Sequence, residues 1–160
     1  DKLCPPQERK LEKVKKYWRL ISDISPIHEI YGETLLASDN ISIDHFVPWS
    51  YVAHDEFWNL HPTTRSINSS KSNRLPDWEI YFPRLAELEH HAYRMIWAYE
   101  AVQHEFRKCA REHLNNPEIE HRLYRQGLGA DAFKEQLQSV IYPIYLSAKT
   151  CGFSSWAYMP

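Results

Sequence analysis

The sequence predicts an α+β fold, in which a compact hairpin and a short helix are embedded in a mainly helical domain. Apolar side chains alternate along residues 41–47, which is typical of a half-buried strand. Before Ser22 and after Pro76 they recur at helical spacing instead. The 160 residues suit a single domain with a sizeable core, and because the chain begins with Asp rather than Met we expect it to be part of a longer protein.

The first predicted element is a helix over residues 5–22. Its two prolines suit a first helical turn, and apolar residues recur at positions 11, 14, 18 and 21. Its polar face is mostly basic and carries Arg9, Lys10, Lys13, Lys15, Lys16 and Arg19 against Glu8 and Glu12. This face is either solvated or follows the phosphates of a nucleic acid, and the pattern leaves both open.

A two-stranded hairpin is predicted next. Residues 28–37 could form its first strand, and Asp39-Asn40 is a turn signal before the second strand at Ile41. Pro48 ends the second strand because proline donates no ladder hydrogen bond. That strand delivers Asp44 and His45 to its far end.

A short helix follows the hairpin. Residues 63–66 could cap it through a side-chain oxygen, and Asn68 and Lys71, three residues apart, lie on one of its faces. Asp44 and Asn68 offer hard oxygen ligands, which suit Mg²⁺ or Mn²⁺ better than Zn²⁺. Neighbours on a strand point to opposite faces, so His45 could take a proton from an attacking water while Lys71 holds a phosphate. This set of residues suits metal-assisted phosphodiester hydrolysis.

The order Asp44-His45-Phe-Val-Pro, Asn59-Leu60, Asn68-Ser-Ser-Lys71-Ser resembles the HNH (His-Me finger, ββα-metal) endonuclease motif. The variant resembled has Asn at the third position, as in CRISPR effector HNH domains and many bacterial defence nucleases. The resemblance implies a ββα-metal core over residues 28–76 and a single-metal endonuclease. It also implies His45 as general base, Asp44 and Asn68 as metal ligands, and Asn59 as the residue that fixes the active-site loop.

One departure from the family concerns zinc. Many members carry cysteine pairs for a structural zinc around this motif, whereas Cys4, Cys109 and Cys151 are far apart and form no such pair. We therefore expect no structural zinc and a hairpin held by packing. The same three cysteines favour a reducing compartment, here the cytoplasm of a bacterium or archaeon, and no apolar run is long enough for a membrane span.

The expected substrate is DNA. Arg65, Lys71 and Arg74 bring positive charge to the predicted centre, and His61 is close enough in sequence to contact substrate. The net charge is −2 and the pI about 6.5, whereas a protein that holds DNA unaided is usually basic. We therefore expect other domains or subunits of a larger nucleic-acid-targeting complex, such as a CRISPR or other antiphage assembly, to present the DNA.

The aromatic loop of residues 49–58 and the helical part of residues 77–160 leave alternatives open. The aromatic rings either cover the hairpin in place of a zinc site or stack bases. Helices are predicted over residues 77–103, with a break or kink near Pro83, and over residues 104–114, 117–124 and 130–147. They either support the hairpin as a lid or scaffold, or form a docking surface. The five histidines of this part are expected to be structural or surface residues.

Two other functions compete with the nuclease. One is a non-cleaving nucleic-acid-binding or protein-interaction module that retains the HNH fold, and the other is a helical interaction domain whose motif is accidental. The presence of Asp44, His45 and Asn68 together favours the nuclease. The strandedness of the substrate, its sequence, the assembly served and the metal used stay open.

Overall fold

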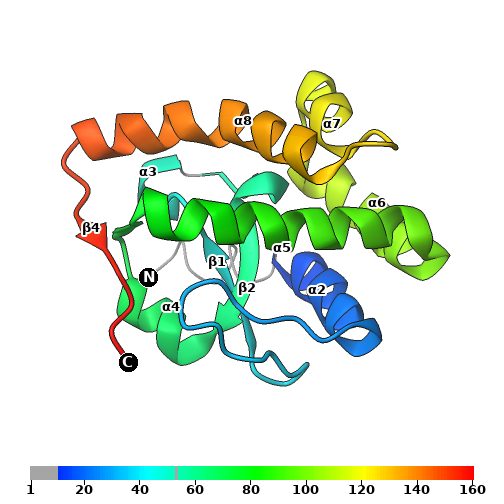
Figure 1. Ribbon diagram of the computed structural model, residues 1–160, viewed down its shortest axis with the longest axis horizontal. Coiled ribbons are helices and arrows are strands. Elements are labelled where there is room, and N and C mark those ends of the chain that lie inside the picture. Colours follow the sequence, from blue (N-terminus) through cyan, green and yellow to red (C-terminus); the bar gives the residue numbers. More distant parts are fainter. Residues whose placement is uncertain (1–10, 53) are drawn as a thin grey trace.

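The computed structural model describes residues 11–52 and 54–160, and it confirms a mixed α+β fold. Figure 1 shows helices α5 (Trp78–Ala98) and α8 (Ala130–Thr150) running along the molecule, with the hairpin behind α5. Helix α2 (Glu12–Ile24) and helix α4 (Arg65–Lys71) pack against the hairpin. The first turn predicted for the N-terminal helix, residues 5–10, lies outside the described residues.

The hairpin consists of strands β1 (Ile41–His45) and β2 (Leu60–Thr64), paired antiparallel with Ile41 opposite Thr64 and His45 opposite Leu60. The prediction of a first strand within residues 28–37 was wrong. That run forms only an isolated bridge between His28 and Leu35. The true partner strand lacks the alternating pattern of a half-buried strand, because four of its five residues are buried, and it also contains a proline.

Helix α4 begins as the sequence predicts. Thr64 is its N-cap, and the side-chain Oγ1 accepts a hydrogen bond of 3.3 Å from the amide of Ile67. The face that carries Asn68 and Lys71 contacts β1, since Asn68 Nδ2 donates to the carbonyl of Ile43. The helix therefore brings its polar residues to the end of the strand that holds Asp44.

The C-terminal part is helical, as predicted, but its break lies elsewhere. Of the two alternatives for Pro83, a break or a kink, the break is wrong, because α5 continues through this proline near its N-terminal end. The chain breaks instead at Tyr99, whose backbone is extended, before helix α6 (Glu100–His113). Asn116 then caps helix α7 (Pro117–Tyr124) through its side-chain oxygen. None of the described helices is long and apolar enough to cross a membrane.

Several short elements lie between the hairpin strands or link the hairpin region to the C-terminal helices. Helix α3 (Trp49–Val52) and the 3₁₀ helix η1 (Phe57–Asn59) lie in the loop between β1 and β2. Strand β3 (Leu75–Pro76) pairs in parallel with β4 (Ser155–Trp156), which joins the end of the chain to the segment after α4.

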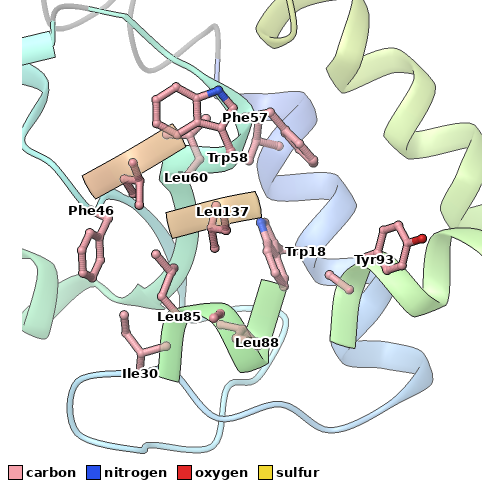
Figure 2. Close-up of a cluster of buried hydrophobic side chains, with 14 of the residues drawn as sticks. Trp18, Ile30, Phe46, Phe57, Trp58, Leu60, Leu85, Leu88, Tyr93 and Leu137 are labelled. Carbon is pink, nitrogen blue, oxygen red and sulfur yellow. The ribbon is translucent and has the colours of Figure 1, made fainter. Parts of the chain in front are cut away.

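The hairpin and the helices share one hydrophobic core. Figure 2 shows side chains from both regions in this core. Leu60 of β2 and Phe46, which directly follows β1, belong to it together with Trp18 of α2, Leu85 of α5 and Leu137 of α8. Phe57 is also buried, and its ring contacts those of Tyr17, Phe106 and Tyr124 edge-on or tilted. Phe57 and its buried neighbour Trp58 are therefore part of the core, which leaves neither ring exposed to stack a base.

Candidate active site

A cleft of about 610 Å³ opens where β1, α2 and α4 meet. We call it the hairpin cleft. The sequence-predicted residues among those that line it are Asp44, His45, Arg65, Asn68 and Lys71, and Lys15 of α2 lines it as well. The fold thus brings together five of the eight predicted site residues.

Asp44 is held by three donors although its side chain is only 4% exposed. Tyr31 donates to its Oδ2 over 2.6 Å, His61 Nε2 to the same oxygen over 2.9 Å, and Lys71 Nζ to Oδ1 over 3.1 Å. Burial by itself would raise the pKa of Asp44, but the charge of Lys71 and the hydrogen bonds from His61 and Tyr31 outweigh it. The pKa therefore lies well below its ordinary value, and the carboxylate is ionised.

Lys71 turns into the protein. Its side chain is 1% exposed, and Nζ donates to the carbonyl of His45 over 2.8 Å as well as to Asp44. Burial lowers the pKa of Lys71 below its ordinary value, and the contact with Asp44 only partly offsets this effect. In this arrangement the ammonium neutralises Asp44, and it is not free to hold a phosphate as the sequence had suggested.

His45 has different partners from those of its neighbour. Its ring is buried, and Nε2 lies 2.7 Å from Oδ1 of Asp55, a residue in the loop between α3 and η1. Sequence analysis missed Asp55, because no periodicity or motif links a loop residue to the end of a strand ten positions earlier.

Asn59 fastens the loop to the strand. Its Oδ1 accepts from the amide of Val47 over 2.9 Å, and its Nδ2 donates to the carbonyl of Val47 over 3.0 Å. The side chain is fully enclosed, and the Asn59 carbonyl also accepts from the amide of Phe46. The geometry suits a residue that fixes the loop.

Asn68 is anchored through its nitrogen. Nδ2 donates to Ser42 Oγ over 3.0 Å and to the carbonyl of Ile43 over 3.2 Å, and no residue that the structure describes donates to its Oδ1. Together with Asp44, this oxygen is the kind of donor that a hard divalent cation prefers, so the residues present fit such an ion. Within residues 11–52 and 54–160 there is no cluster of three or more His, Cys, Asp or Glu side chains that could hold a metal.

The remaining predicted residues lie in different settings. Arg65 is exposed on the rim of the hairpin cleft. Arg74 is also exposed, but it donates to the carbonyls of Ser70 and Lys71 at the end of α4. His61 is fully buried behind Asp44, which leaves it no surface for a substrate.

The basic face of α2 is largely paired within the protein. Lys13 lies 2.9 Å from Glu112 and Lys16 lies 3.7 Å from Glu105, both acids being on α6. Lys15 lies 3.9 Å from Glu12 and is the lysine of this face that lines the hairpin cleft. Of the described part of this face, Lys15 is thus the residue best placed to meet a substrate.

Comparison with known protein families identifies the hairpin and its flanks. A family model described as HNH endonuclease matches residues 28–77, the segment that contains β1, β2 and α4. This segment, about a third of the chain, is therefore similar to HNH endonucleases. No curated protein and no solved structure matches the chain.

The match to the HNH endonuclease model gives the cleft a general function. It indicates a nuclease that binds nucleic acid, and HNH nucleases generally use divalent metals. The matched segment covers every sequence-predicted site residue, from Asp44 to Arg74. Asp55 lies within it as well.

Proposed function

We propose that this HNH segment is a metal-dependent endonuclease centre that hydrolyses DNA phosphodiester bonds, with His45 as general base. The observation that carries the proposal is that Asp44, His45 and Asn68 line one cleft, next to Lys15 and Arg65. A carboxylate, an amide oxygen, an imidazole and two cations suit metal-assisted phosphodiester hydrolysis.

Asp44 and Asn68 would hold the metal, with Mg²⁺ as the expected ion and Mn²⁺ as a substitute. When bound, the metal supplies charge stabilisation at the phosphate and the leaving oxygen. Tyr31 and His61 keep the Asp44 carboxylate in one orientation, and Ser42 does the same for the amide of Asn68. Lys71 balances the charge of Asp44 inside the protein.

His45 would take the proton from the attacking water. It lies at the end of β1, next to Asp44 in sequence but with a separate hydrogen-bond partner. Asn59 holds the strand end and the loop together, which keeps His45 at a fixed position on the cleft wall. Lys15 and Arg65 would contact the phosphates that flank the scissile bond, and Arg74, just beyond the end of α4, would contact a phosphate further out.

The larger context that we propose is a nuclease module of a CRISPR or other antiphage assembly. The support is electrostatic: the net charge is −2, and two lysines of α2 are paired with acids of α6. Because so few cations are free to contact phosphates, we expect weak, salt-sensitive binding to DNA, with a Kd of about 10⁻⁴–10⁻⁶ M. A partner that raises the local DNA concentration should then accelerate cutting, which a comparison of the cleavage rate with and without such a partner at equal salt would measure.

The deciding experiment is a cleavage assay on single-stranded DNA, double-stranded DNA and RNA of the same sequence. Each is incubated with the protein and Mg²⁺, with Mn²⁺, or with excess EDTA. We expect cleavage of DNA in either metal and none in EDTA. Cleavage that survives EDTA would contradict the metal dependence, and binding of DNA without any cleavage would favour the non-cleaving module.

A further inference from the structure

The contact between His45 and Asp55 defines which nitrogen of the His45 ring carries the proton. Nε2 and the Asp55 Oδ1 are 2.7 Å apart, and the two side chains are only 8% and 10% exposed. An ionised carboxylate can only accept hydrogen bonds, so Nε2 must donate. In a neutral ring the other nitrogen, Nδ1, then keeps its lone pair. No residue that the structure describes forms a hydrogen bond with this nitrogen.

A hydrogen bond from helix α6 holds the backbone of Asp55 in place. Its backbone carbonyl accepts a hydrogen bond of 2.7 Å from Nδ1 of His113, a buried residue in the last turn of α6. Asp55 follows α3 and precedes η1, so no regular element fixes its backbone. The bond from α6 supplies that support, while Asn59 ties the end of the same loop to β1.

We propose that Asp55 is a positioning residue for His45, and that His113 positions Asp55 in turn. Asp55 holds the imidazole in the Nε2–H tautomer and prevents its rotation, so that Nδ1 is presented as the base. Through His113, helix α6 therefore helps to position His45, in addition to its packing in the core. The inference rests on the proposed function, because it assigns His45 the role of general base.

The physical consequence of losing Asp55 is a ring that samples both tautomers and more than one orientation. Only a fraction of molecules would then present a lone pair in the correct direction. Misplacement of a reacting group by about 1 Å can cost about 10²-fold in rate. Substrate binding should be little affected, because Asp55 does not itself line the hairpin cleft.

The test combines kinetics with a tautomer measurement on the same 160 residues. For Asp55→Ala we expect kcat to fall by about 10²-fold, with KM within threefold of the unmodified protein. Glu56→Gln is the matched control, since it changes the adjacent loop carboxylate and should leave kcat within twofold. For His113, Asn retains a donor near the position of Nδ1, so His113→Asn should keep more activity than His113→Leu.

The second measurement is ¹⁵N NMR of histidine-labelled protein, with the His45 signals assigned by their loss in His45→Ala. The unmodified protein should show a proton on Nε2 and a lone pair on Nδ1 of His45, and Asp55→Ala should show a mixture. A proton on Nδ1 in the unmodified protein, or an unchanged tautomer and kcat in Asp55→Ala, would overturn the proposal. The NMR result requires no cleavage, so a protein that fails to cut would refute the nuclease while the tautomer still decides the role of Asp55.

Discussion

Two carboxylates, one in the hairpin and one in the helical part, are equally buried, but their pKa values are shifted in opposite directions. Asp44 on β1 and Glu89 on α5 are each 4% exposed. Asp44 accepts from Tyr31, His61 and Lys71, and its pKa lies well below the ordinary range. Glu89 forms no hydrogen bond with any residue that the structure describes, its Oε2 is fully enclosed, and burial raises its pKa well above the ordinary value.

The difference shows that partners, rather than depth, decide the charge of a buried acid in this protein. Burial opposes ionisation at both places, and only the hairpin supplies donors that outweigh it. Removal of one partner of a buried ion pair lowers stability strongly, because the other charge is left uncompensated inside the protein. The hairpin thus keeps Asp44 ionised with Lys71 as its counter-charge, while the helical core favours a neutral acid.

The largest effect on stability should come from neutralising Asp44. Asp44→Asn leaves the buried ammonium of Lys71 without its counter-charge, and we expect the free energy of unfolding to fall by about 3–5 kcal/mol. Urea unfolding at pH 7 measures it, and Asp39→Asn, an exposed acid just before β1, is the control that should change stability by less than about 0.5 kcal/mol. Equal effects of the two substitutions would mean that the pairing of Asp44 contributes nothing.

The second prediction concerns metal affinity. Asp44→Ala and Asn68→Ala should each weaken metal binding, and higher Mg²⁺ or Mn²⁺ should partly restore cleavage in at least one of them. Tyr31→Phe removes only the orienting hydroxyl of Tyr31 and should cost about 10–100-fold in metal affinity or activity. The measurement is the metal concentration that gives half-maximal cleavage. An unchanged value in both alanine variants would show that these residues are not ligands.

The third prediction uses pH to contrast the two acids. The pKa of Glu89 is raised on folding, so the native state binds its proton more tightly than the unfolded chain does. Its contribution to stability is therefore full below about pH 4.5, the ordinary value, and is lost as pH rises from there toward the folded pKa. Glu89→Met removes the acid, so the variant should gain stability relative to the unmodified protein as pH rises above about 4.5.

For Asp44 the sign is reversed. Its folded pKa is lowered, so its contribution is present above the ordinary value of about 3.8 and is lost as pH falls below that value. Urea unfolding between pH 3 and 8 measures both slopes. A stability difference between Glu89→Met and the unmodified protein that does not change with pH would remove Glu89 from the comparison.

The smallest predicted effect concerns surface charge. Lys13 is paired with Glu112 at a part-exposed position, and such pairs contribute about 0–1 kcal/mol. Glu112→Gln should leave stability nearly unchanged and tighten DNA binding by a few-fold at low salt, because it frees one lysine of α2. Glu135→Gln on α8 removes the same charge from another exposed site and is the control. Fluorescence anisotropy with a labelled oligonucleotide would detect the change, and identical shifts in both variants would mean that net charge alone matters.

How far the sequence predicts this structure depends on how local each feature is. Strand β1, the Thr64 cap and the shared face of Asn68 and Lys71 follow from neighbouring residues. Strand β2 was not predicted, because it is buried almost throughout and does not alternate. The inward turn of Lys71 depends on the packing of α4 against β1, which residue spacing cannot specify.

The candidate site divides in the same way. The predicted residues on β1 and α4 do meet at one cleft, since a motif of fixed order reflects a fixed local fold, whereas His61 on β2 does not line it. Asp55 and Tyr31, which hold His45 and Asp44, come from loops outside that pattern. They are defined only by tertiary contacts, as is the link from α6 through His113.

The central claim, that His45 is the base of a nuclease centre, is tested most directly by the single-turnover rate of DNA cleavage with saturating Mg²⁺. His45→Ala should lower this rate by about 10²–10⁴-fold, with folding and DNA binding close to those of the unmodified protein. The control is His104→Ala, an exposed histidine on α6, which should cleave at the unmodified rate. A His45→Ala rate within threefold of the unmodified protein would contradict the account and remove His45 from the mechanism.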